Sequence, residues 1–78
     1  MMRISSNMAK AINDQISFEA SSANAYTSIG SWCERTVYDG SAAFFFEQAN
    51  EENGHMLKFL HYLNGTGAEA VIPAISRG

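Results

Sequence analysis

The sequence predicts an all-α fold, an antiparallel two-helix hairpin that forms half of a four-helix bundle. Two long segments carry apolar residues at alternating steps of three and four, which is typical of helices that face a partner helix. A short break between them makes the two helices run antiparallel. At 78 residues, the chain is expected to form a single domain over residues 1–78.

The first helix is expected over about residues 6–34. This segment contains no proline, its only internal glycine is Gly30, and Ser5 or Ser6 can cap its start. Its inward stripe steps by four and three residues and includes one glutamate: Ile12, Ile16, Glu19, Ala23, Tyr26, Gly30 and Cys33.

The second helix is expected over about residues 41–64. Before it, residues 35–40 interrupt the helical pattern with β-branched side chains and a turn-forming Asp39-Gly40 pair. After it, the Asn64-Gly65-Thr66-Gly67 segment supplies a glycine stop. The inward stripe again contains one glutamate among apolar residues: Ala42, Phe45, Ala49, Glu52, Met56, Phe59 and Leu63.

An apolar tail follows, over about residues 68–76. It is rich in β-branched residues around Pro73, so we expect an extended segment that lies against another surface.

The hairpin also predicts partner helices. Two helices that touch along one stripe leave several large apolar side chains without a second layer: Ile29, Phe44, Phe46, Leu57 and Leu60. The missing helices are expected either from a second copy of this chain or from a C-terminal half outside this sequence.

Composition narrows the classes of partner and the compartment. The 5 basic and 8 acidic residues give a net charge of −3, which disfavours nucleic acid and anionic membranes as partners. The single cysteine, Cys33, cannot form an internal disulfide, and the N-terminus does not resemble an export signal. A cytoplasmic location is therefore expected.

The two stripe glutamates are the strongest sign of chemistry. A carboxylate at a core position costs several kcal/mol unless it is paired or binds a metal. Glu19 and Glu52 lie at similar distances from the predicted turn, and His55 shares a helix face with Glu52 at a spacing of three residues. These oxygen and nitrogen ligands suit a first-row metal, especially iron or manganese, although zinc is also compatible.

Other polar residues have open alternatives. Glu51 is either an accessory metal ligand or part of a solvated face. Tyr26 either acts near the metal, as a hydrogen-bond or electron donor, or packs in the core. His61 is expected at the surface, and Cys33 has no neighbouring base in sequence that would make it a nucleophile.

The combined pattern from about Met8 to Ile75 resembles the non-haem bacterial ferritins, which belong to the ferritin-like di-iron family. The resemblance covers only the first half of a ferritin, its first two helices and the start of the long crossover. It rests on these segments: Asn13 to Glu19, Ser22 to Tyr26, Ser31 to Cys33, Phe44-Phe45, Gln48 to His55, and Tyr62 to Asn64 with Gly67.

The resemblance implies half of a ferritin-like four-helix bundle that oxidises Fe(II) at a di-iron ferroxidase centre for iron storage or detoxification. Glu19 matches the first-helix iron ligand, Glu52 the bridging carboxylate and His55 the histidine ligand. Tyr26 matches a tyrosine near the centre, and Glu51 matches a glutamate of an additional iron site. The implied cofactor is iron (Fe2+/Fe3+). The implied partner is a further copy of the chain, in a homo-oligomer that is either a dimer of hairpins or a ferritin-type shell.

Ferroxidase activity depends on how the di-iron site is completed. The remaining ligands come either from the other half of a ferritin or from a second hairpin, since two copies of Glu19, Glu52 and His55 supply the usual set. The two-helix encapsulated ferritins resemble the second arrangement. A third interpretation is a catalytically inactive helical interaction module.

Overall fold

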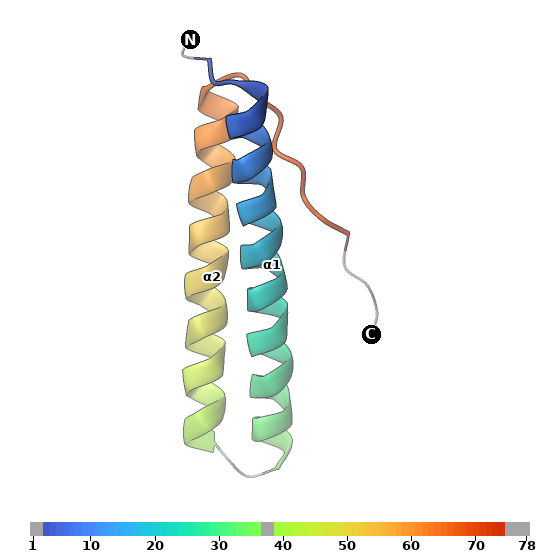
Figure 1. Cartoon of the computed structure of the whole chain (residues 1–78). Helices are drawn as coiled ribbons and strands as arrows, with labels where there is room; N and C mark the ends of the chain where they lie inside the picture. The colour runs from blue at the N-terminus through green and yellow to red at the C-terminus, as the bar shows by residue number, and fades with distance from the viewer. Residues whose placement is uncertain (1–2, 37–38, 75–78) are drawn as a thin grey trace.

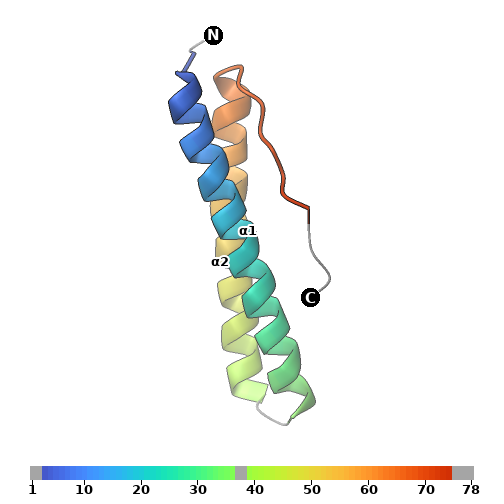
Figure 2. The ribbon, with the colours of Figure 1, turned by 45° about the vertical axis from the view of Figure 1, so that its right-hand side comes forward.

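In a computed structural model, the described residues, 3–36 and 39–74, form two long helices and an extended tail. Helix α1 spans Ser6–Arg35 and helix α2 spans Asp39–Gly65. The two helices lie side by side and antiparallel over their whole length (Figures 1 and 2). The hairpin is elongated, with principal extents of 50 × 22 × 13 Å. The predicted all-α antiparallel hairpin is confirmed.

Helix α1 begins where the sequence offers a cap. The Ser5 hydroxyl accepts a 3.1 Å hydrogen bond from the backbone N–H of Met8, which satisfies one of the free amides of the first turn. At the other end, the backbone N–H of Thr36 donates to the carbonyls of Trp32 and Cys33. The helix therefore ends one residue later than expected.

Helix α2 begins two residues earlier than expected, and the prediction that Asp39-Gly40 forms the turn was wrong. Both residues have helical backbone in the first turn of α2. An aspartate is stabilised at a helix N-terminus by the helix dipole, so an Asp-Gly pair after a break fits a helix start as well as a turn. The rest of the expected turn, Val37 and Tyr38, lies outside the described residues.

The predicted glycine stop of α2 takes the form of a Schellman motif. The N–H of Ala68 donates to the carbonyl of Leu63 at 3.1 Å, and the N–H of Gly67 donates to that of Asn64 at 3.3 Å. Gly67 has a φ of 81°, a left-handed conformation that glycine adopts without steric cost.

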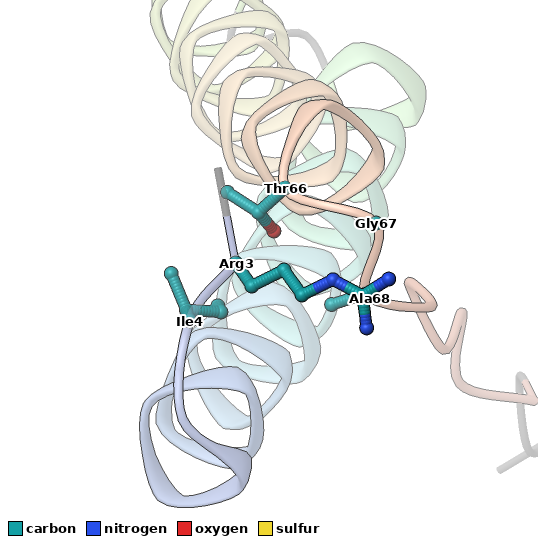
Figure 3. A pocket seen from close by; sticks show the side chains of 5 residues that line it. All are labelled: Arg3, Ile4, Thr66, Gly67 and Ala68. Atoms are coloured by element: carbon teal, nitrogen blue, oxygen red, sulfur yellow. The ribbon is translucent and has the colours of Figure 1, made fainter. Parts of the chain in front are cut away.

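Beside this motif, a hollow of about 330 Å³ lies at the open end of the hairpin, lined by Arg3, Ile4, Thr66, Gly67 and Ala68 (Figure 3).

The helix interface follows the two predicted stripes. Its buried residues are Ile16, Glu19, Ala23, Gly30 and Cys33 on α1, with Ala42, Ala49 and Leu63 on α2. Most of these side chains are small, so the helices approach closely. A Cβ atom built on Gly30 would lie only 2.7 Å from Cε1 of Phe46, which shows that glycine makes room for this ring.

The extended tail lies along α1 (Figure 1). The side-chain amide of Asn13 holds it at two points: its Nδ2 donates to the Glu69 carbonyl at 3.1 Å, and its Oδ1 accepts from the Val71 N–H at 2.7 Å. The tail is therefore held against α1 at residues 69 and 71, and the expected residues 75–76 fall outside the described part. Neither described helix is long and apolar enough to cross a membrane.

Candidate metal centre

Glu19 is a buried carboxylate at the middle of the helix interface. The residue is only 6% exposed, because its position in the inward stripe of α1 turns it toward α2. Its Oε1 accepts a 3.0 Å hydrogen bond from Nε2 of Gln15, one helical turn earlier. Its Oε2 is buried and has no hydrogen-bond partner. A buried carboxylate oxygen without a partner is costly, so this atom is suited to bind a cation.

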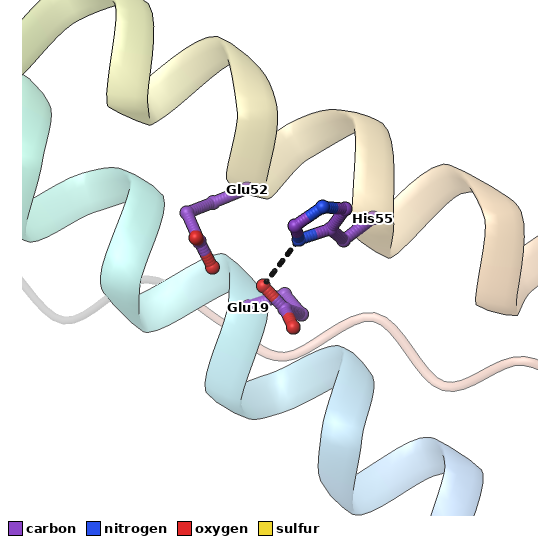
Figure 4. A group of neighbouring side chains, drawn as sticks. All are labelled: Glu19, Glu52 and His55. Carbon is purple, nitrogen blue, oxygen red and sulfur yellow. Dashed lines mark ion pairs between the residues drawn. The ribbon is translucent and has the colours of Figure 1, made fainter.

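Glu52 and His55 approach Glu19 from α2, as Figure 4 shows. Their spacing of three residues places both side chains toward α1. Nδ1 of His55 lies 3.5 Å from Oε2 of Glu19, and the His55 side chain is 52% exposed. The histidine thus links the buried carboxylate to the surface of the hairpin.

The three side chains form one group that can hold a metal ion. One ligand atom from each of Glu19, Glu52 and His55 lies within 4.8 Å of the others. Two carboxylate oxygens and one imidazole nitrogen match the ligand preference of iron, manganese and zinc. The orphaned Oε2 of Glu19 is independent support for this fit, since a bound cation would supply its missing partner.

The two carboxyl groups influence each other's titration. The neighbouring carboxyl group of Glu52 has the largest effect and lowers the pKa of Glu19; burial opposes this shift, and Gln15 and His55 add smaller lowering effects. The neighbouring Glu19, together with desolvation, raises the pKa of Glu52. Of the two groups, Glu19 is therefore the one that more readily carries the negative charge.

The remaining predicted site residues lie outside this group. Glu51 is exposed on α2. Tyr26 is half-buried two turns along α1 from Glu19, and its ring stacks on Phe45 at a centroid distance of 6.2 Å. His61 is exposed and Cys33 is buried, as expected.

Gln15 is a residue for which the sequence alone predicted no role. Its hydrogen bond to Glu19 fixes the orientation of that carboxylate, which makes Gln15 a positioning residue. The available signal was its spacing of four residues before Glu19, which places the two side chains on one face of α1.

Two antiparallel helices that bring one glutamate together with a Glu-x-x-His pair match half of the ligand arrangement of carboxylate-bridged four-helix bundles. This arrangement defines the class as ferritin-like. The family model for the ferritin-like domain matches residues 9–77, and the chain belongs to the ferritin family.

Known relatives agree with this assignment. The chain is 43% identical over 72 residues to a probable bacterial non-heme ferritin-like protein of Haemophilus influenzae, and the match covers 92% of this chain and 44% of the relative. It is 40% identical over 73 residues to a bacterial non-heme ferritin of Staphylococcus aureus, covering 94% of this chain and 44% of the relative. The chain thus spans less than half the length of these curated relatives and corresponds to their N-terminal part.

A solved structure gives the same result for the fold. The ferritin of Chlorobium tepidum superposes with a TM-score of 0.88 at 36% sequence identity, over 96% of this chain and 46% of that chain. The predicted half of a ferritin-like bundle is thereby confirmed.

Proposed function

We propose that this protein binds Fe(II) through Glu19, Glu52 and His55 and oxidises it at a di-iron ferroxidase centre, for iron storage or detoxification. The observation that carries the proposal is the convergence of three ligand atoms within 4.8 Å around the orphaned Oε2 of Glu19. Two similar proteins carry the names bacterial non-heme ferritin and ferritin, which supports iron as the metal.

Each residue has a distinct part in this proposal. Glu19 supplies a carboxylate that is already oriented by Gln15, so little ordering is needed when Fe(II) binds. Glu52 supplies a second carboxylate, which binds the cation in its deprotonated form. The half-exposed His55 gives Fe(II) a route from the surface. When bound, two Fe(II) ions give one electron each to O2 or peroxide and become Fe(III).

Two further residues are assigned supporting roles. Tyr26 donates a hydrogen bond or an electron near the centre, and Glu51 acts as an accessory iron ligand at the exposed side of α2. Tyr26→Phe is expected to slow Fe(II) oxidation while it leaves Fe(II) affinity unchanged. Glu51→Gln is expected to weaken only additional iron binding, beyond about one iron per chain.

The proposal includes assembly and location. A homo-oligomer, either a dimer of hairpins or a ferritin-type shell, supplies the ligands that one hairpin lacks. A cytoplasmic location follows from the family resemblance and from the single cysteine, which does not call for an oxidising compartment.

The test compares the two histidines of the chain. Anaerobic Fe(II) titration and oxygen-dependent Fe(III) formation are measured for the unmodified protein, His55→Ala, Glu19→Gln and the exposed control His61→Ala. We expect His55→Ala and Glu19→Gln to lower affinity and oxidation rate at least tenfold, the scale on which loss of a ligand acts. His61→Ala should behave like the unmodified protein. Fe(II) oxidation no faster than in buffer would overturn the proposed function.

A catalytically inactive helical interaction module is the second candidate. It is favoured by large apolar side chains that are exposed on both helices, including Phe18, Phe44 and Leu57. If the protein binds no iron and oxidises none, this candidate replaces the first.

A further inference from the structure

One face of the hairpin leaves large apolar side chains exposed beside the metal group. In an antiparallel pair of right-handed helices, positions that come one residue before the contact stripe lie on the same face in both helices. We call this the site face, and its aromatic and large aliphatic residues are Phe18, Ile29, Trp32, Phe44, His55 and Tyr62. Phe18 is 62% exposed and Phe44 is 55% exposed. The tail lies on the opposite face, where Asn13 follows the stripe residue Ile12.

The metal group on the site face is half of a complete ligand set. Di-metal sites in four-helix bundles take one glutamate from each of two helices and a Glu-x-x-His pair from each of the other two. The hairpin supplies one member of each kind, namely Glu19 and the Glu52–His55 pair. The missing half is chemically the same set.

We propose that a second copy of this chain packs its site face on the first about a two-fold axis that passes beside the metal group, so that the two copies share two metal ions. The inference rests on the proposed function for its ligands and adds the partner that completes them. A two-fold interface brings the same residues of both copies together.

The place of the group along the helices fits this symmetry. Glu52 is the central residue of α2, and Glu19 lies within two residues of the centre of α1. A two-fold axis perpendicular to the helices at this level therefore lays each hairpin over nearly the full length of the other. A group near one end of the helices would leave half of each apolar face uncovered.

The site face is also complementary to itself. The two-fold axis is taken perpendicular to the helices, at a level midway between Glu52 and His55. It then places Phe44 of the second copy level with Leu63 of the first copy, next to Tyr62. There, a mainly apolar hollow of about 370 Å³, lined by Ile12, Lys58, Phe59 and Tyr62, can receive an aromatic ring.

Charge supports the same register. The charged side chains at site-face positions of the described helices, apart from the metal group, are Glu51 and Lys58. The two-fold axis brings Glu51 of one copy within about one helical turn of Lys58 of the other, at 1.5 Å per residue. Outside the metal group, the charges at this interface therefore attract each other, and the shared metal ions would offset the repulsion between the carboxylates of the two copies.

The test measures native mass and bound Mn(II) per chain for the 78-residue protein, with Phe44→Arg and the adjacent outward-facing control Ala43→Arg. We expect a dimer, or a multiple of dimers, with two Mn(II) per pair for the unmodified protein and Ala43→Arg. Phe44→Arg should weaken dimerisation at least tenfold and lose the paired metals, while its helical circular dichroism remains. A monomer at all metal concentrations, or a particle that Phe44→Arg does not change, would overturn the inference.

A charge exchange gives a second, independent readout. Lys58→Glu should weaken the dimer, and the addition of Glu51→Lys should restore it, because the pair then carries reversed charges. A double variant that dimerises no better than Lys58→Glu speaks against this register and overturns the inference.

The outcome separates the inference from the proposed function. A dimer that binds Mn(II) in pairs but does not oxidise Fe(II) supports the inference and overturns the proposed function. A monomer that oxidises Fe(II) supports the proposed function and overturns the inference, and it assigns the site face to another occupant, such as further helices of a longer polypeptide.

Discussion

Nδ1 of His55 and Oε2 of Glu19 face each other across the helix interface at 3.5 Å, and the carboxylate oxygen has no hydrogen-bond partner. A cation between these two atoms satisfies both, whereas the metal-free hairpin keeps a buried carboxylate oxygen that makes no hydrogen bond. Stability and metal binding are therefore opposed at Glu19.

The first prediction follows from that opposition. Replacing buried charged groups by apolar side chains of similar size is often neutral or stabilising by about 1–4 kcal/mol, because the desolvation cost of the polar atoms is removed. Glu19→Met should raise the free energy of unfolding of the chelator-treated protein and abolish metal binding. Urea denaturation checks this, with the exposed Glu34→Met as control. A lower denaturation midpoint for Glu19→Met than for Glu34→Met would contradict it.

The second prediction concerns the pH dependence of the metal-free protein. The pKa of Glu19 is lowered, chiefly by the neighbouring Glu52 carboxyl, so its contribution to stability is present above the unfolded pKa and is lost as pH falls through the folded pKa. The pKa of Glu52 is raised, chiefly by the neighbouring Glu19, so its contribution is present below the unfolded pKa and is lost as pH rises through the folded pKa.

Stability from this pair should therefore peak between the two folded pKa values, which lie on either side of the ordinary value of 4.5. Thermal unfolding at a series of pH values on both sides of 4.5 measures this in the unmodified protein and in Glu52→Gln, which cannot release a proton. The stability of the unmodified protein relative to that of Glu52→Gln should fall as pH rises. A difference that is independent of pH would refute the coupling.

The third prediction compares two glycines in helix interiors. A glycine-to-alanine change in a helix stabilises by about 1 kcal/mol where space allows. A Cβ on Gly54 would lie in open space, with no packing neighbour within 4 Å, whereas a Cβ on Gly30 would clash with the Phe46 ring. Gly54→Ala should raise the unfolding free energy, and Gly30→Ala should lower it, since overpacking costs about 1–3 kcal/mol. In a Phe46→Ala background, Gly30→Ala should lose most of its destabilising effect, because the ring that it clashes with is gone. Equal effects of Gly54→Ala and Gly30→Ala on the unfolding free energy would disprove the close contact.

The fourth prediction concerns the tail. Asn13 supplies both hydrogen bonds that fix residues 69 and 71 to α1. Asn13→Ala should release the tail and increase hydrogen exchange at the Val71 amide, while the amides in the middle of α2 remain protected. The exposed Asn24 of α1 offers a matched control, and unchanged exchange at Val71 would mean that other contacts hold the tail.

Much of the fold and of the metal group could be predicted because both depend on helical periodicity. The same three-four spacing that defines the stripes also places Glu19 and Glu52 in them, so the site emerges wherever a charge interrupts the apolar pattern. The start of α2 could not be predicted, since Asp39-Gly40 fits a turn and a helix N-terminus equally well. The Asn13 contacts could not be predicted either, because they join residues 56 and 58 positions apart, and local spacing carries no information about them.

The last prediction assigns Gln15 its role. Because Gln15 donates to Oε1 of Glu19, it holds the carboxylate in the orientation that leaves Oε2 toward His55. Removing such a partner typically costs about 10- to 100-fold in metal affinity. Gln15→Leu should therefore weaken Mn(II) binding about tenfold and raise the pKa of Glu19, because the hydrogen bond that favours its charged form is lost. Isothermal titration with Mn(II) and an NMR titration of the Glu19 carboxyl carbon measure the two effects. Gln15→Asn, whose shorter amide does not span the same distance, should behave like Gln15→Leu, whereas Gln15→Glu should keep Mn(II) affinity closer to that of the unmodified protein by offering a further carboxylate. If Gln15→Leu binds Mn(II) with unchanged affinity, Glu19 is oriented by its packing alone.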